Sequence, residues 1–120
     1  MDPEVAELLA ELDPAVYCID CLPNMNATTV RERAVPLVKT IRSKRPDTPI
    51  LLVEDRTYAN APFIRSLQDR HRDSRRELRK AYDSLINEGF EKLGYVNGDA
   101  LLGEDRDDTT DGSHPNDLGF

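Results

Sequence analysis

The sequence predicts an α/β fold built on a parallel sheet. Helical and extended patterns alternate along the 120 residues, which is typical of this fold class. Two short apolar runs, residues 15–19 (AVYCI) and 49–53 (PILLV), are bounded by turn-forming residues, as strands buried in a parallel sheet are. The length is enough for one hydrophobic core, so residues 1–120 are expected to form a single domain.

The first helix is expected to begin at Asp2, a favoured capping residue, and Pro3, which is favoured in a first helical turn. Asp13 and Pro14 end the helical pattern. The first strand follows, and its continuous apolar character predicts burial on both faces. The expected buried face of the helix has the i, i+3, i+4, i+7 spacing and consists of Val5, Leu8, Leu9 and Leu12.

The second helix is expected to begin near Thr29 and Glu32, which have capping-box spacing. Pro36 lies inside the helical pattern, so the helix is either kinked there or begins at that residue. The second strand, residues 49–53, is followed by a polar loop over residues 54–60. The expected buried face of the helix consists of Val30, Ala34, Leu37, Val38 and Ile41.

A long helix is expected from about Pro62 to Leu93, with Gly94 as its C-terminal cap and a short last strand over residues 95–97. Its middle, Arg70 to Lys80, is rich in arginine. This stretch is either an anion or nucleic-acid patch or a solvated face, and the acidic residues interleaved with it favour the solvated face. His71 is expected to be a boundary residue of the helix rather than a ligand.

Composition excludes several classes of function. The net charge of −7 argues against nucleic acid as the main partner. No apolar run reaches the roughly 18 residues of a membrane helix, and no targeting segment is present, so the sequence assigns no membrane and no compartment. The acidic run over residues 104–112 invites comparison with a calcium loop, but the template placed with its first position at Asp107 fails at Leu118, where a glutamate is required. No metal or organic cofactor is expected.

Cys18 and Cys21 have the Cys-x-x-Cys spacing of a redox pair or of half a metal site. Three residues of an extended strand span about 10 Å, which is beyond the roughly 7 Å between Cα atoms that a disulfide allows. A zinc site would need two further ligands, and the chain has no second cysteine pair. The two cysteines are therefore interpreted as small residues at the end of a buried strand.

Polar residues follow each predicted strand. Asn24 comes after the first strand, Arg56 after the second, and Asp111 and His114 after the last. The carboxyl ends of parallel strands meet at one edge of a sheet, where ligands bind. A carboxylate three residues before an imidazole, on a glycine-containing turn, can orient the ring as a general base. These residues are the candidate site.

The segments that carry these residues resemble blocks of the SGNH (GDSL-like) hydrolases, in particular the bacterial acyl-esterase, acetylhydrolase-like branch. They are residues 20–25 (DCLPNM), 53–59 (VEDRTYA) and 111–115 (DGSHP). The resemblance extends over essentially the whole chain and is weakest in the arginine-rich stretch. It implies a flavodoxin-like fold, with a parallel sheet in a three-layer sandwich, and hydrolysis of carboxylic esters without a cofactor.

The resemblance also implies roles for single residues. Asn24 matches the asparagine that donates to the oxyanion hole, His114 matches the general base, and Asp111 matches its orienting partner. Arg56 has no defined role in the family and is treated as a candidate substrate contact. The expected substrate is a small acyl ester, with acylated carbohydrates among the candidates.

The chain departs from this family at the nucleophile. The family serine lies in a Gly-Asp-Ser block on the first strand, and a second block supplies an oxyanion-hole glycine, but this chain has no glycine before Gly89. Ser113 is too close to His114 along the chain to attack. The chain is therefore expected to be the C-terminal portion of such a hydrolase, without the first strands, and inactive alone. The alternative is a non-catalytic α/β binding module or a truncated inactive fragment.

Loss of the first strands has a structural consequence. The family sheet is ordered 2-1-3-4-5, so the strand that begins at Ala15 and ends at Asp20 would be left at the edge. A bare apolar edge strand can pair with another strand. The chain is therefore expected to self-associate through this strand, to bind a partner there, or to aggregate.

Overall fold

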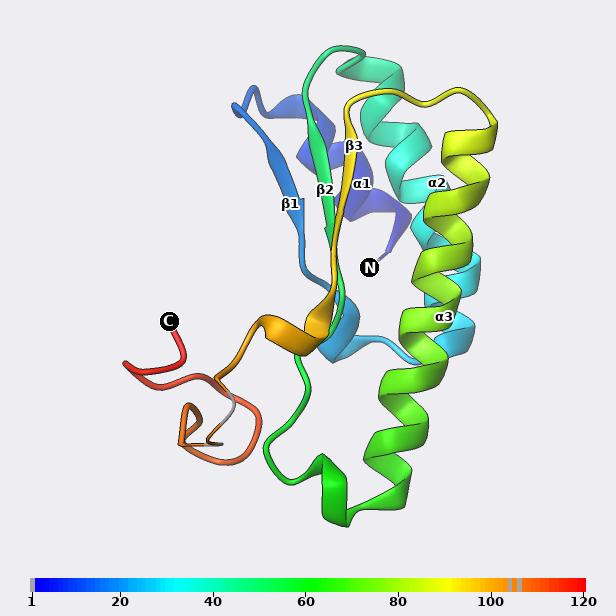
Figure 1. Cartoon of the computed structure of the whole chain (residues 1–120). Helices are drawn as coiled ribbons and strands as arrows, with labels where there is room; N and C mark the ends of the chain where they lie inside the picture. The colour runs from blue at the N-terminus through cyan, green and yellow to red at the C-terminus, as the bar shows by residue number, and fades with distance from the viewer. Residues whose placement is uncertain (1, 104, 106) are drawn as a thin grey trace.

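The structure is a computed structural model that describes residues 2–103, 105 and 107–120. Its centre is a parallel sheet in the order β1-β2-β3, with helices beside it, which confirms the predicted α/β class (Figure 1). The strands are β1 (Tyr17–Ile19), β2 (Ile50–Val53) and β3 (Leu93–Val96). The helices are α1 (Pro3–Glu11), α2 (Ala27–Lys44) and α3 (Arg65–Asn87).

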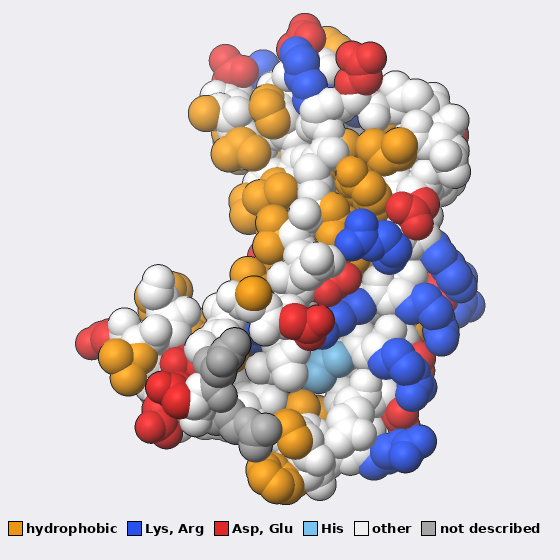
Figure 2. Space-filling model, viewed as in Figure 1, with side chains coloured by type: hydrophobic (Ala, Val, Ile, Leu, Met, Phe, Trp, Pro, Cys, Tyr) orange, Lys and Arg blue, Asp and Glu red, His pale blue; other side chains and the backbone are white. Residues whose placement is uncertain are grey.

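The helices of the described chain pack on one face of the sheet (Figure 1). Strand register places Cys18, Leu51 and Gly94 in one row across the other face. Cys18 is exposed, so the prediction that the first strand is buried on both faces is wrong. The residues of β1 are apolar enough for burial on both faces of the sheet, but the described residues provide a helical layer on only one face. Figure 2 shows hydrophobic side chains along the side of the sheet away from α3.

The core lies between the sheet and the two longer helices. The predicted buried face of α2 is confirmed at each of its five positions. Its side chains meet Leu52 of β2 and Leu78 and Leu85 of α3, which are almost completely buried. Packing on this scale is what holds the carboxyl ends of the strands, and the loops that follow them, in one place.

The predicted buried face of α1 is wrong except at Leu9, which is partly buried against the core. Ala6 and Ala10 are buried, whereas Leu8 and Leu12 are 62% and 54% exposed. The small alanine side chains face α2, and the hydroxyl of Tyr17 donates to the carbonyl groups at the end of α1. The predicted start is confirmed, with Asp2 at the N-cap position and Pro3 as the first helical residue, but the Asp2 carboxylate makes no capping hydrogen bond and pairs with Arg33 of α2 instead.

Two predicted helix boundaries are also corrected. Asn26, not Thr29, caps α2, because its side chain accepts a hydrogen bond from the Thr29 N–H at 2.9 Å. The helix then runs through Pro36 without beginning there. At the other end of the chain, α3 ends at Asn87, and Gly89 takes the left-handed conformation at φ +86°.

Gly94 belongs to β3 rather than to a helix cap. A Cβ atom at this position would lie 2.9 Å from Cδ1 of Leu51 on the neighbouring strand. Glycine therefore avoids a steric clash with the Leu51 side chain. Leu93 begins the strand instead of ending the helix. The helical period of α3 therefore extends by chance into a segment that pairs with β2.

The arginine-rich stretch of α3 has two kinds of surroundings. Arg72 and Arg76 lie on the exposed face and pair with Asp69 and Asp73, as the solvated-face interpretation predicts (Figure 2). Arg75, in contrast, turns inward and donates to the backbone carbonyl of Asp55. His71 is buried, with only 5% of its surface exposed, so the predicted boundary position is wrong.

Candidate active site

Asp111 and His114 form a close pair on the turn near the C-terminus. Nδ1 of His114 lies 2.7 Å from Oδ2 of Asp111. The backbone N–H groups of Ser113 and His114 donate to Oδ1 of the same carboxylate, at 3.0 and 2.8 Å. Since an ionised carboxylate only accepts, this geometry assigns the proton to Nδ1 and leaves the Nε2 lone pair free to act as a base.

Hydrogen bonding keeps the Asp111 carboxylate ionised. The backbone N–H of His114, followed by its ring and by the N–H of Ser113, lowers the pKa of Asp111 below its usual range. The side chains of His114 and Asp111 are 73% and 54% exposed. The imidazole therefore stands at the surface, where a group from outside the described residues can reach it.

The turn depends on Gly112, which has φ +90°. A Cβ atom there would lie 3.2 Å from the side chain of Asn60, so the close approach also favours glycine. The carbonyl of Gly112 accepts a hydrogen bond from the Ala59 N–H at 2.8 Å. The loop after β2 and the C-terminal turn are thus joined by their backbones.

Arg56 joins the same two segments through its side chain. Its Nε donates to the backbone carbonyl of Ser113, and its Nη2 donates to Oγ of Ser113 at 2.9 Å. The structure therefore brings Arg56, Asp111 and His114 together through Ser113. No sequence pattern predicted this contact, because its partners are 57 positions apart.

A buried charge cluster lies behind Arg56. Asp55 is 1% exposed, and its carboxylate lies 3.4 Å from Nδ1 of His71, 3.8 Å from Nη1 of Arg56 and 4.0 Å from Nε of Arg70. Nε2 of His71 accepts a hydrogen bond from the Tyr58 N–H at 3.4 Å. The sequence pattern predicts only a polar loop over this segment. The position of Asp55 two residues after a buried strand was the signal that could have identified it.

Glu54 fixes the carboxyl ends of the two neighbouring strands. It is buried, and its carboxylate accepts hydrogen bonds from the Tyr95 hydroxyl at 2.6 Å and from the Gly98 N–H at 2.8 Å. Burial, followed by this hydrogen bond, raises the pKa of Tyr95 above its usual value. The edge of the sheet that carries the candidate site is therefore rigidly connected from β2 to β3.

Asn24 ends a short 3₁₀ helix, Leu22–Asn24, directly after β1. This helix lies at the same end of the sheet as the loop after β2 and the C-terminal turn (Figure 1). The Asn24 side chain is exposed, and none of the hydrogen bonds between described residues joins it to His114. Arg70 donates to the carbonyl of the preceding Pro23, which anchors this short helix to α3.

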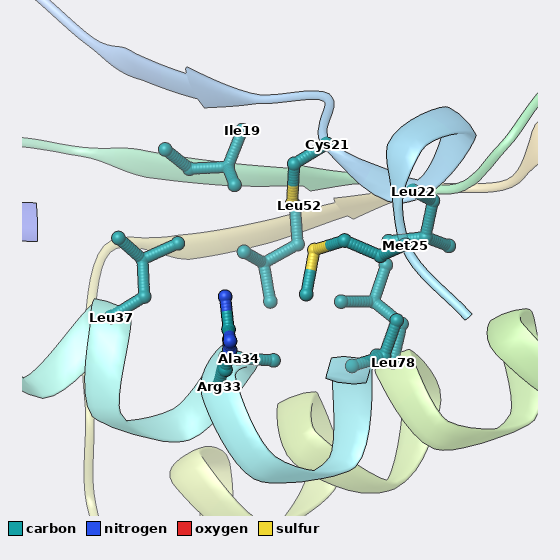
Figure 3. A pocket seen from close by; sticks show the side chains of 10 residues that line it. Ile19, Cys21, Leu22, Met25, Arg33, Ala34, Leu37, Leu52 and Leu78 are labelled. Carbon is teal, nitrogen blue, oxygen red and sulfur yellow. The ribbon is translucent and has the colours of Figure 1, made fainter. Parts of the chain in front are cut away.

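A small apolar pocket lies between β1, the 3₁₀ helix after it, and α2 (Figure 3). Its volume is about 10 Å³, which is room for one water molecule at most. Cys21 and Met25 point into it, and burial raises the pKa of the Cys21 thiol. This pocket is a gap in the core rather than a substrate site.

A second pocket, of about 240 Å³, lies between the loop after β2 and the segment that precedes Asp111. Hydroxyl and carboxyl groups contribute to its lining, which includes Thr57, Asp99, Asp108 and Thr109. Asp108 is 5% exposed, and its Oδ2 has no hydrogen-bond partner among the described residues.

Residues 2–103, 105 and 107–120 contain no cluster of three or more His, Cys, Asp or Glu side chains arranged to hold a metal. Within the same residues, no helix combines the length and the apolar character that a membrane crossing requires. Cys18 and Cys21 are both free thiols.

The model of the GDSL-like Lipase/Acylhydrolase family matches residues 1–120. A solved structure from Bacteroides ovatus ATCC 8483, named as a candidate GDSL-like lipase, is 33% identical with a TM-score of 0.94. The match covers 99% of this chain and 35% of that one. No curated protein matches.

A second solved structure, the salicylyl-acyltransferase SsfX3 from a tetracycline biosynthetic pathway, is 21% identical with a TM-score of 0.72. The match covers 98% of this chain and 37% of that one. At 21% identity, the similarity shows the fold alone. The chain thus spans about a third of the length of both solved structures.

Proposed function

The chain belongs to the GDSL-like lipase/acylhydrolase family, and we propose that it supplies the general base, its orienting carboxylate and one oxyanion donor of a serine ester hydrolase. The observation that carries this proposal is the 2.7 Å contact between Asp111 and His114. A carboxylate that holds Nδ1–H while Nε2 stays free is the arrangement that a serine nucleophile requires.

In this mechanism, Nε2 of His114 takes the proton from a serine hydroxyl as the hydroxyl attacks the ester carbonyl. Asp111 stabilises the imidazolium that forms, because its carboxylate remains ionised. The imidazolium then returns the proton to the departing alcohol, which leaves an acyl-enzyme. A water molecule, activated in the same way, releases the acid.

Asn24 is the proposed oxyanion donor. Its exposed side chain at the carboxyl end of β1 is free to donate from its amide to the oxygen of a tetrahedral intermediate. Loss of one such donor typically lowers kcat by about 10²–10³-fold. The anchoring of Pro23 by Arg70 supports a fixed position for this residue.

The nucleophile is proposed to come from sequence outside these 120 residues. Four of the five serines lie in α2 and α3. The fifth, Ser113, has its Oγ bound by Arg56 and its N–H bound by Asp111, so it is occupied in holding the turn. These contacts support the assignment of a separate attacking serine.

The proposed substrate is a small acyl ester of a hydroxylated alcohol, with carbohydrate esters as the leading class. The support is the second pocket, whose hydroxyl and carboxyl lining can bind several hydroxyl groups. Asp108, which is only 5% exposed, is one of the carboxyl residues of this lining.

The gene provides the first test. A Gly-Asp-Ser-like block encoded in frame before Met1 would support the proposal, whereas a stop codon and promoter there would favour a non-catalytic binding module. The longer protein, which is this chain together with such an in-frame block, should then hydrolyse p-nitrophenyl acetate. His114→Ala should abolish this activity. Asp117→Asn, on the same terminal segment, is the matched control and should retain it. Activity that survives His114→Ala would contradict the assigned base.

A further inference from the structure

We propose that Arg56 is a positioning residue of this site, which holds the Asp111–His114 turn against the sheet through Ser113. This inference rests on the proposed function, since it assigns the residue a part in the same reaction. It differs from a substrate contact because the guanidinium acts on the turn rather than on the ester.

The contacts of Arg56 are directed at the residue before the candidate base. Nε donates to the Ser113 carbonyl and Nη2 donates to Ser113 Oγ, so two parallel N–H groups bind one residue. The Arg56 side chain is only 15% exposed. Together with the Ala59–Gly112 backbone hydrogen bond, it fastens both residues that precede His114 to the loop after β2.

The direction of the guanidinium is itself constrained. Its remaining nitrogen, Nη1, lies 3.8 Å from the buried Asp55 carboxylate, and its centre lies 5.6 Å from the centre of the Tyr58 ring. Asp55 lies two residues after β2, which is part of the core sheet. Arg56 therefore connects the rigid sheet to the exposed turn.

Arginine suits this role better than lysine. Its planar guanidinium presents two donors to Ser113 at a fixed angle and leaves Nη1 within ion-pair distance of Asp55, whereas a lysine ammonium has no such geometry. Asp111 and Arg56 then have separate tasks. Asp111 orients the imidazole within the turn, and Arg56 places the turn relative to the rest of the site.

Placement matters because a displacement of about 1 Å can cost about 10²-fold in rate. In the longer protein, we expect Arg56→Met to lower kcat about 10²-fold while KM changes less than about twofold. Arg56→Lys should recover part of the loss. Arg72→Met, which removes an arginine from the exposed face of α3, is the control and should leave both constants unchanged. A higher KM with unchanged kcat would show a substrate contact and overturn the proposal.

A second measurement does not depend on activity. Amide hydrogen exchange in the 120-residue chain, followed by NMR, should become faster at Ala59 and Thr110 in Arg56→Met, because both N–H groups bind the turn. Amides of β2 should keep their protection, which verifies the fold. Ser113→Ala removes one acceptor without disturbing Asp55 and should give a smaller effect. Unchanged exchange at Ala59 and Thr110 in Arg56→Met would overturn the positioning role even if the hydrolase proposal holds.

If the longer protein has no esterase activity but Arg56→Met still loosens the turn, the positional coupling stands and the proposed function fails. If the protein is active and the turn is unaffected, the proposed function stands and this inference fails. The two proposals are therefore tested separately.

Discussion

Asp111 holds His114 with both of its carboxylate oxygens. Oδ2 lies 2.7 Å from Nδ1 of the ring, and Oδ1 accepts the backbone N–H of the same histidine at 2.8 Å. The aspartate thus orients the imidazole and shapes the turn that carries it. A change at Asp111 should affect both functions, and the two effects can be measured separately.

We expect Asp111→Asn in the longer protein to lower kcat by about 10⁴-fold, because an amide can donate to Nδ1 and stabilise the wrong tautomer of the ring. Steady-state kinetics with p-nitrophenyl acetate measure this loss, and the ¹⁵N shifts of the His114 ring report the tautomer directly. Asp117→Asn is the matched control. A variant with less than a tenfold loss would contradict the orienting role.

The 120-residue chain alone should not hydrolyse p-nitrophenyl acetate above the level of its His114→Ala variant. The reason is that the proposed attacking serine lies outside the chain and Ser113 is held by Arg56 and Asp111. Spectrophotometric release of p-nitrophenol measures this. Turnover that depends on His114 would show that a nucleophile is present in the chain.

Glu77 should make stability depend on pH in acid. It is buried between α2 and α3, and hydrogen bonds from Arg31, then from Lys80, lower its pKa from 4.5 to about 2. A carboxyl with a lowered pKa in the folded state stabilises the fold above pH 4.5, and this contribution is lost as the pH falls toward 2.

Between pH 5 and about pH 2.5, the free energy of unfolding of the wild-type chain should therefore fall more than that of Glu77→Gln. Urea unfolding at several pH values in this window provides the measurement. Glu32→Gln, at an exposed position on α2, should follow the wild type. Parallel curves for wild type and Glu77→Gln would refute the expectation.

The two cysteines should differ in reactivity. Cys18 is exposed on the uncovered face of the sheet, whereas burial raises the pKa of Cys21 and reduces its thiolate fraction. Iodoacetamide at pH 8 should therefore alkylate Cys18 first, as mass spectrometry of the peptides can show. In the Cys18→Ser variant, only the slow alkylation of Cys21 should remain. Equal rates, or an intramolecular disulfide, would be inconsistent with this structure.

We propose that two copies of the chain associate through the outer edge of β1. This strand is at the edge of the described sheet, and Leu8, Leu12 and Val16 near it are about half exposed. Unpaired strand edges with apolar neighbours favour pairing with another strand. Sedimentation velocity should show a dimer or larger species at micromolar concentration.

Val16→Lys places a charge beside this edge and should shift the distribution toward monomer. Ile86→Lys, which changes a similarly exposed residue on α3, should not. A stable wild-type monomer across the concentration range would eliminate self-association through β1.

Much of the fold could be predicted from local patterns. The apolar spacing of α2 identified its buried face residue by residue, because an 18-residue helix samples its own period several times. The nine residues of α1 cover fewer helical turns, so the pattern is less decisive there. It predicted a buried face that includes the leucines, whereas Ala6 and Ala10 are the buried residues. The two glycines after α3 also could not be told apart from the sequence. Gly89 follows the helix end, and only the pairing of Gly94 with Leu51 shows that Gly94 belongs to a strand.

The candidate site divides in the same way. The Asp111–His114 pair follows from the sequence alone, because a separation of three residues on a glycine turn brings both side chains within reach. The sequence also indicates that Asn24, Arg56 and His114 follow successive strands toward one edge. Three features depend on the folded chain: Arg56 binds Ser113, Asp55 and His71 are buried together, and one face of the sheet is uncovered in the described residues. These features join residues that are far apart in sequence, and local periodicity holds no information about such pairs.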